Sequence, residues 1–234
     1  ATQKKAKPQF IYIFGAGHAD GRADMKQLLG GKGANLAEMT NLGVPVPPGL
    51  TLTTEVCRAF YELGERWPSG FEAELAQKMS WLESVTKKGF GDPKNPLLVS
   101  VRSGAAVSMP GMMDTILNLG LNDRTAQGLI DKTSNPRFVY DAYRRFIQMY
   151  GNVVLGTEHR TFEEKLAAAK ARAKVSTDAE LPAEALKELV KEFTQLIRQA
   201  KRLDFPDDPM EQLRGAINAV FSSWNNERAN IYRR

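Results

Sequence analysis

Residues 97–123 read LLVSVRSGAAVSMPGMMDTILNLGLND, and the composition of the chain changes across this stretch. The apolar run 97–101 predicts a buried strand, and 115–119 predicts its partner. Before the stretch, short apolar runs alternate with helical patterns, whereas almost every segment after about Asn122 has helical periodicity. The sequence therefore predicts an α/β (α+β) fold with a helical second half.

Caps and chain breakers mark the bounds of further segments. In the first half we expect a strand at 11–14, an extended passage at 49–52 and helices at 34–42, 54–63 and 71–84. In the second half we expect helices at 137–150, 161–173, 182–200 and 209–224. Thr161 is expected to open the second of these with a capping box, and Asp208 to cap the last. We divide the chain into an α/β lobe, residues 1–121 and 206–234, and a helical subdomain, residues 122–205.

The composition excludes several classes of protein. Of the 234 residues, 42% are hydrophobic and 25% are charged, which is ordinary for a globular protein. Cys57 is the single cysteine, which excludes an internal disulfide framework. No apolar run approaches the roughly 20 residues that cross a bilayer. We therefore expect no membrane segment and a cytoplasmic location, or an organelle if the source is a eukaryote.

The net charge of +5 is concentrated at the two ends of the chain. Residues 1–7 hold three lysines, and residues 227–234 hold three arginines against one glutamate. The intervening residues 8–226 carry 26 basic and 26 acidic side chains. A nucleic-acid-binding protein presents a basic stripe or patch, so the sequence argues against nucleic acid as a partner.

The Gly-Gly-Lys-Gly run at 30–33 is the first candidate for a binding site. Glycines let backbone amides approach an anion closely, the following helix start adds positive potential, and Lys32 supplies a mobile charge. The run is not a Walker A loop, because Lys26 stands at the place of its first glycine and Gly33 at the place of its Ser or Thr. A solvated lysine in a glycine-rich turn is the alternative.

Arg102 is the second candidate, because it lies at the carboxyl end of a predicted strand and is followed by a loop of small residues. From there a guanidinium can reach a ligand beyond the sheet edge and hold phosphate oxygens bidentately. The alternative is an arginine that pairs with a local acid.

Weaker signals come from four other places. The methionine-rich loop 108–115 could close over a ligand or could fill the core. Of the adjacent Arg144 and Arg145, one could face a ligand while the other is solvated, and the arginines within 225–234 could face an anion or solvent. His18 and His159 have no nucleophile pattern nearby, so we assign both to structural or solvated roles.

Three stretches resemble the N-terminal part of the pyruvate, phosphate dikinase family. They are LLGGKGANLAEM at 28–39 followed by VPPG at 46–49, the stretch 97–123 quoted above, and NPRFVYDAYRRFIQMY at 135–150. The loop SMPGMMDT at 108–115 differs from its counterpart in the related phosphoenolpyruvate synthases. The resemblance runs from Phe10 onward, and it implies an ATP-grasp-like nucleotide-binding lobe with a helical insertion.

The resemblance also implies a function and a set of site residues. The family makes phosphoenolpyruvate, AMP and diphosphate from pyruvate, ATP and phosphate through a phosphohistidine. Lys32 and Arg102 correspond to contacts with the nucleotide phosphates, and Arg145 to a further phosphate-directed arginine. The segment over the phosphates corresponds to 103–115, which includes Ser103, Gly104 and Thr115.

The family's chain is several times longer, so we expect this one to be an N-terminal fragment that binds nucleotide phosphates without turnover. We expect no catalytic residue and no metal ligand in it. The remainder of the dikinase chain would hold the phosphocarrier histidine, the residues that bind Mg²⁺ with ATP, and the pyruvate barrel. We expect ATP and this remainder as partners, and we expect the full enzyme to be a homodimer. Two alternatives stay open: a phosphoenolpyruvate synthase-type dikinase, and a non-catalytic regulatory or docking module of the same fold.

Overall fold

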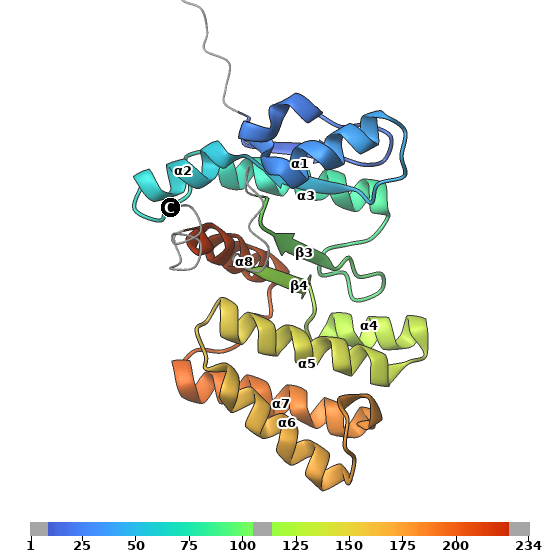
Figure 1. The fold of residues 1–234 in the computed structure, drawn as a ribbon. Helices are drawn as coiled ribbons and strands as arrows, with labels where there is room; N and C mark the ends of the chain where they lie inside the picture. The colour runs from blue at the N-terminus through green and yellow to red at the C-terminus, as the bar shows by residue number, and fades with distance from the viewer. Residues whose placement is uncertain (1–8, 105–113, 225–234) are drawn as a thin grey trace, which may run out of the picture. The chain divides into compact units, whose positions relative to one another are not determined.

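The computed structural model describes residues 9–104 and 114–224 (Figure 1). The described chain divides into two compact units. The first comprises residues up to Lys87 together with Ser103 and Gly104, and the second comprises 88–102 and 114–224. Both contain helices and a two-stranded sheet, so the predicted mixed α/β class is confirmed. The likeness to ATP-grasp enzymes and the domain boundaries at 121 and 206 stay predictions.

The first unit is built around an antiparallel pair of strands, β1 (Ile11–Phe14) and β2 (Gly49–Leu52). The remaining elements of this unit are η1 (Ala23–Met25), α1 (Lys26–Asn41), α2 (Thr54–Glu62) and α3 (Phe71–Thr86). Helices α1 and α3 pack against the strands. The core of the unit includes the fully buried side chains of Ile11, Leu29, Val56, Phe60, Phe71 and Leu75.

Two carboxylates hold the backbone next to β1. Glu74 of α3 accepts hydrogen bonds from the amides of Phe10 and Ile11, and Asp20 accepts one from the amide of Ile13. Lys78 of α3 pairs with Asp20 at 3.3 Å. Burial alone would raise the pKa of Asp20, but the amide of Ile13 and the charge of Lys78 lower it below its usual value.

The second unit contains the strands β3 (Val99–Arg102) and β4 (Thr115–Leu119), which pair antiparallel with an irregularity between Val99 and Val101. Helix α8 (Pro209–Ser223) packs on both strands, and α5 (Pro136–Val153) packs on β4 (Figure 1). The predicted pairing of the two segments is confirmed. The expectation of a buried first strand is wrong, because exposed and half-buried residues alternate along β3.

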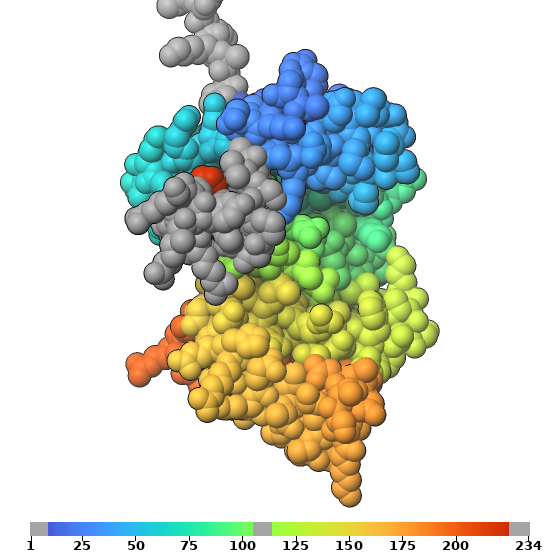
Figure 2. All heavy atoms as spheres, viewed as in Figure 1, coloured from blue at the N-terminus to red at the C-terminus, as the bar shows by residue number. Residues whose placement is uncertain are grey.

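The other helices of the second unit are α4 (Asp123–Thr133), α6 (His159–Ala173), the short η2 (Asp178–Glu180) and α7 (Ala183–Lys201). Helix α7 packs against α5 and α6, and these helices form one continuous body in the space-filling view (yellow and orange in Figure 2). Phe162 of α6 and Phe193 of α7 meet edge to face, with ring centroids 5.0 Å apart. Both rings are fully buried, so apolar packing holds this bundle together.

A buried polar network joins the strands to the helices of this unit. Gln212 of α8 has no exposed side-chain surface. Its Oε1 accepts a hydrogen bond from the amide of Gly120 at 2.8 Å, and its Nε2 donates to the carbonyls of Leu121 and Pro206 at 2.9 and 2.8 Å. Asn122 donates to the carbonyl of Asp207 at 2.9 Å. The network thus ties the turn before α4 to the segment before α8.

Most helix ends agree with the predictions within two residues. Helix α5, however, continues to Val153 beyond the expected end at 150, and α4 lies where no separate helix was expected. The helix expected at 34–42 starts at Lys26 and contains a break at Gly30. The capping box at Thr161 is wrong, since α6 starts at His159 and the Thr161 hydroxyl donates to the carbonyl of Glu158 at 2.7 Å. By contrast, Asp208 caps α8 as expected, through a hydrogen bond from the amide of Met210.

Candidate functional site

The glycine-rich run lies inside α1. At Gly30 the backbone has φ 70° and ψ 168°, a conformation that glycine adopts without the steric cost borne by other residues. A Cβ at Gly30 would collide with the carbonyl group of Gly104, and one at Gly33 would collide with the side chain of Thr51. Glycine at these two positions therefore allows the helix to change direction and to approach a neighbouring backbone closely.

Lys32 lies in the first turn after this break. Its side chain is exposed, and its Nζ donates a hydrogen bond to the carbonyl oxygen of Ser103 at 3.1 Å. The first amides of a helical section lack acceptors within the helix, and they carry the positive end of its dipole. An ammonium group beside such amides is suited to bind an anion. The structure thus brings together three of the predicted site residues, Lys32, Ser103 and Gly104.

Arg102 and Thr115 form a second group. They are cross-strand partners at the last position of β3 and the first position of β4. Arg102 is exposed, and none of the described residues forms a hydrogen bond or ion pair with its guanidinium. The alternative of a local acid partner therefore has no support among those residues. Ser103, whose carbonyl receives the hydrogen bond from Lys32, is the next residue along the chain.

The adjacent arginines of α5 have different environments. The Arg144 side chain is 6% exposed and pairs with Asp141 at 2.8 Å and with Asp178 of η2 at 2.9 Å. Lys170 of α6 also reaches Asp178, at 2.9 Å. Burial alone would raise the pKa of Asp178, but Lys170 and Arg144 lower it below its usual value. Arg144 is therefore a structural residue that holds the α6–α7 connection against α5.

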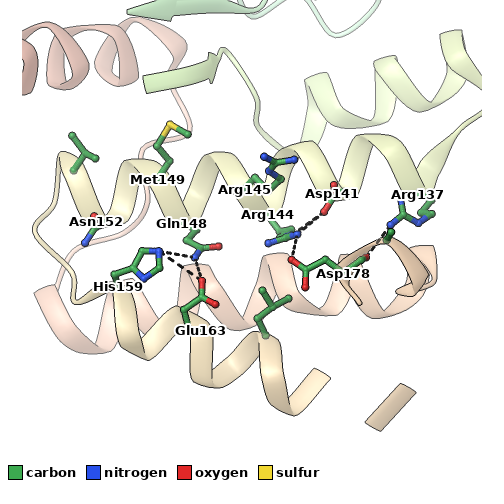
Figure 3. A pocket seen from close by; sticks show the side chains of 13 residues that line it. Arg137, Asp141, Arg144, Arg145, Gln148, Met149, Asn152, His159, Glu163 and Asp178 are labelled. Atoms are coloured by element: carbon green, nitrogen blue, oxygen red, sulfur yellow. Dashed lines mark hydrogen bonds and ion pairs between the residues drawn. The ribbon is translucent and has the colours of Figure 1, made fainter. Parts of the chain in front are cut away.

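Arg145, in contrast, is exposed and has no hydrogen-bond or ion-pair partner in the part of the chain that the structure describes. It lines an open groove of about 680 Å³ between α5, α6 and η2 (Figure 3). Of the two arginines, Arg145 is the one that is available to a ligand. The sequence left this choice open, because helical periodicity alone does not show which of two neighbours has acidic partners.

The weaker sequence signals give no further group of site residues. The methionine-rich segment up to Met113 and the arginines within 225–234 lie outside the described residues. His18 pairs with Asp20 at 3.1 Å on the surface. Burial raises the pKa of the Cys57 thiol to about 11, so this cysteine is almost entirely protonated at neutral pH.

Two kinds of feature are absent from the described residues. No three or more His, Cys, Asp and Glu side chains within 9–104 and 114–224 converge as they would around a metal ion. No helix in the same ranges is both long enough and apolar enough to span a bilayer.

A glycine-broken helix start that carries a lysine is typical of phosphate-binding proteins, and exposed arginines are a second feature that such proteins use. Comparison with known proteins agrees with this class. Residues 26–79 and 64–234 match the family model described as pyruvate phosphate dikinase, AMP/ATP-binding domain. The chain belongs to this family.

The chain is also similar over most of its length to proteins named pyruvate, phosphate dikinase. The chain is 51% identical over 223 residues to the chloroplastic pyruvate, phosphate dikinase of Flaveria pringlei, an alignment that covers 95% of this chain and 23% of the relative. It is 51% identical over 225 residues to the pyruvate, phosphate dikinase of Rhizobium meliloti (strain 1021), and 52% identical over 225 residues to pyruvate, phosphate dikinase 2 of Zea mays. Each of these two alignments covers 96% of this chain and 25% of the relative. The chain thus spans about a quarter of the length of the curated relatives it matches.

Proposed function

We propose that this chain binds the phosphate groups of ATP as the N-terminal portion of the ATP-binding domain of a pyruvate, phosphate dikinase. The observation that carries the proposal is the hydrogen bond from Lys32 to the carbonyl of Ser103, beside the close approach of Gly30 to Gly104. Two motifs separated by about 70 residues in the sequence meet there at the start of a helical section. The family match supports the same reading.

The chemistry of each residue suggests its role. The ammonium of Lys32 would leave the neutral Ser103 carbonyl for a phosphate oxygen, because the negative charge of that oxygen adds attraction between opposite charges to the hydrogen bond. The guanidinium groups of Arg102 and Arg145 have no partner among the described residues, so they can make bidentate contacts with phosphate. The backbone of Ser103 and Gly104 and the hydroxyl of Thr115 add neutral donors. Each of these groups would stabilise negative charge on a phosphate as a phosphoryl group is transferred.

The activity of the whole enzyme is part of this proposal. It makes phosphoenolpyruvate, AMP and diphosphate from pyruvate, ATP and phosphate, and a histidine elsewhere in the dikinase attacks the β-phosphorus while Lys32 and Arg102 neutralise charge. Mg²⁺ would accompany ATP and draw charge from its phosphates. No described residue is assigned to this ion, since no three or more His, Cys, Asp or Glu side chains among them converge as metal ligands would. The partners of this chain are ATP and the remainder of the dikinase chain. The full enzyme is a homodimer in the cytoplasm or in an organelle. The isolated chain has no turnover.

Calorimetric titration with Mg-ATP tests the proposal. The wild-type chain is expected to bind ATP weakly, in the high-micromolar to millimolar range, and to bind adenosine without measurable heat. Arg102→Ala is expected to weaken ATP binding by about 10-fold or more, because a hydrogen bond to a charged group contributes about 1.5–3 kcal/mol. Arg124→Ala is the matched control, since its side chain is 68% exposed and its only ion pair, with Asp207, is 3.8 Å long among the described residues.

Two results would refute the proposal. Equal affinity of the wild-type and Arg102→Ala chains for ATP would remove Arg102 from the site. If no binding is detected at about 10 mM Mg-ATP, this chain does not hold nucleotide phosphates by itself.

A further inference from the structure

Two helices of the second unit present pairs of polar side chains to the same groove. Gln148 and Asn152 lie one turn apart on α5, and His159 and Glu163 lie one turn apart on α6. All four line the groove between these helices (Figure 3). Side chains four residues apart share a helix face, so each helix directs two donor groups toward the other.

Three of these side chains bring their polar atoms close together. Nε2 of Gln148 lies 2.6 Å from Oε1 of Glu163 and 3.4 Å from Nε2 of His159, and the latter two atoms are 3.7 Å apart. The point equidistant from all three atoms lies about 1.9 Å from each, and an ion slightly above that plane reaches the distance of about 2.0–2.2 Å at which zinc binds nitrogen and oxygen ligands. The three positions therefore lie within reach of one metal ion, while the Gln148 nitrogen as it stands donates a hydrogen bond to Glu163 and is not itself a metal ligand.

The donor set indicates the class of ion. Half a turn of the Gln148 amide exchanges its nitrogen and oxygen, after which an imidazole nitrogen, a carboxylate oxygen and an amide oxygen face one point. Imidazole with oxygen donors suits Zn²⁺ and its neighbours among the divalent transition metals, whereas Mg²⁺ and Ca²⁺ prefer oxygen alone. The side chains of His159 and Glu163 are 61% and 50% exposed, which leaves room for water to complete the coordination.

The charges around this set allow a cation. None of the described lysines or arginines forms an ion pair with Glu163. The other histidine of the chain provides the contrast: His18 also lies close to a carboxylate, but that of Asp20 is already bound by Lys78 and by the amide of Ile13. Arg145 lines the same groove as Glu163 and opposes a cation, so the affinity is expected to be micromolar and not tighter.

We propose that His159, Glu163 and Gln148 form a binding site for one divalent transition-metal ion of the Zn²⁺ class, which links α5 to α6. An ion bound there stabilises the folded helices by mass action, because it binds the native arrangement and not the unfolded chain.

Titration with ZnCl₂ at pH 7.5, in a buffer without chelators, tests the site by calorimetry and by the thermal midpoint of unfolding. The wild-type chain is expected to bind one ion with micromolar affinity and to unfold at a higher temperature when it is bound. His159→Ala and Glu163→Gln should each weaken binding at least 10-fold. His18→Ala is the matched control and should leave the affinity within twofold of the wild-type value.

Three results would overturn the proposal: no stoichiometric Zn²⁺ binding by the wild-type chain, unchanged affinity in His159→Ala, or an equal loss in His18→Ala. His159 and Glu163 are at least half exposed, so their variants should fold, and far-ultraviolet circular dichroism checks this. A Cys57→Ser variant that loses Zn²⁺ binding would assign the ion to the thiol and would also overturn the proposal.

Discussion

Replacement of Gln212 by leucine tests the network that joins the strands to the helices of the second unit. Leucine is similar in size to glutamine but has no polar atoms, so Gln212→Leu leaves the amide of Gly120 and the carbonyls of Leu121 and Pro206 without their partners. Each buried group left unsatisfied costs about 1–3 kcal/mol. Pro206 is only half-buried, and water can reach its carbonyl. We therefore expect a loss of about 3 kcal/mol in the free energy of unfolding, and a fall of roughly 10 °C in the thermal midpoint.

The assay is urea-induced unfolding followed by far-ultraviolet circular dichroism, with Gln127→Leu as the control. Gln127 is exposed on α4 and its amide donates to Asp131 on the surface, so its replacement should change the free energy of unfolding by less than about 0.5 kcal/mol. Gln212→Glu adds a second check, because an ionised carboxylate would face the carbonyls of Leu121 and Pro206. Protonation restores a donor, so the cost of this variant relative to wild type should shrink at acidic pH. A Gln212→Leu chain within about 1 kcal/mol of the wild-type stability would refute the reasoning.

Three further predictions concern single side chains. Arg144→Met should lower the free energy of unfolding by about 2–3 kcal/mol. This is less than the largest cost of breaking a buried ion pair, because Asp141 and Asp178 stay partly hydrated. Arg145→Met should lower it by less than about 0.5 kcal/mol. Cys57 should react slowly with a thiol reagent at pH 7.5 and faster as the pH approaches its pKa of about 11, and a rate equal to that of a free thiol would contradict its burial. Burial alone would raise the pKa of Asp20, but hydrogen bonds and Lys78 lower it. The contribution of Asp20 to the free energy of unfolding is therefore present above its unfolded pKa of about 4 and is lost as the pH falls below it. Asp20→Asn should thus destabilise the chain more at pH 7 than at pH 3, and an equal effect at both would contradict this.

Elements with strong local signals could be predicted from the sequence. The proline and aspartate at 208–209 place the start of α8, and Thr53 caps α2 through the amide of Val56, as the sequence indicates. The break at Gly30 could not be predicted, because the carbonyl group of Gly104 that Gly30 approaches closely comes from more than 70 residues away. The prediction of a capping box at Thr161 was wrong because the two residues before it, from His159 on, are already part of the helix.

The candidate site was predictable to a similar extent. Lys32 and Arg102 stand at a glycine-rich turn and at a strand end, and such positions are visible in a sequence. The distinction between Arg144 and Arg145 was not, because it depends on Asp178, which folds back from a later segment. Gln212 and the group around His159 gave no sequence signal, since their partners come from other elements and neither residue type is unusual in a helix.

The most direct test of the central claim is an NMR titration of the ¹⁵N-labelled chain with Mg-ATP, which detects weak binding at the level of single amides. We predict that a set of amide resonances shifts together and saturates as ATP is added, namely those of Gly31, Lys32, Gly33, Ser103 and Gly104. These shifts should disappear in Arg102→Ala but persist in Arg124→Ala. Saturable shifts centred on other residues, or no shifts at millimolar ATP, would contradict the claim that these residues bind nucleotide phosphates.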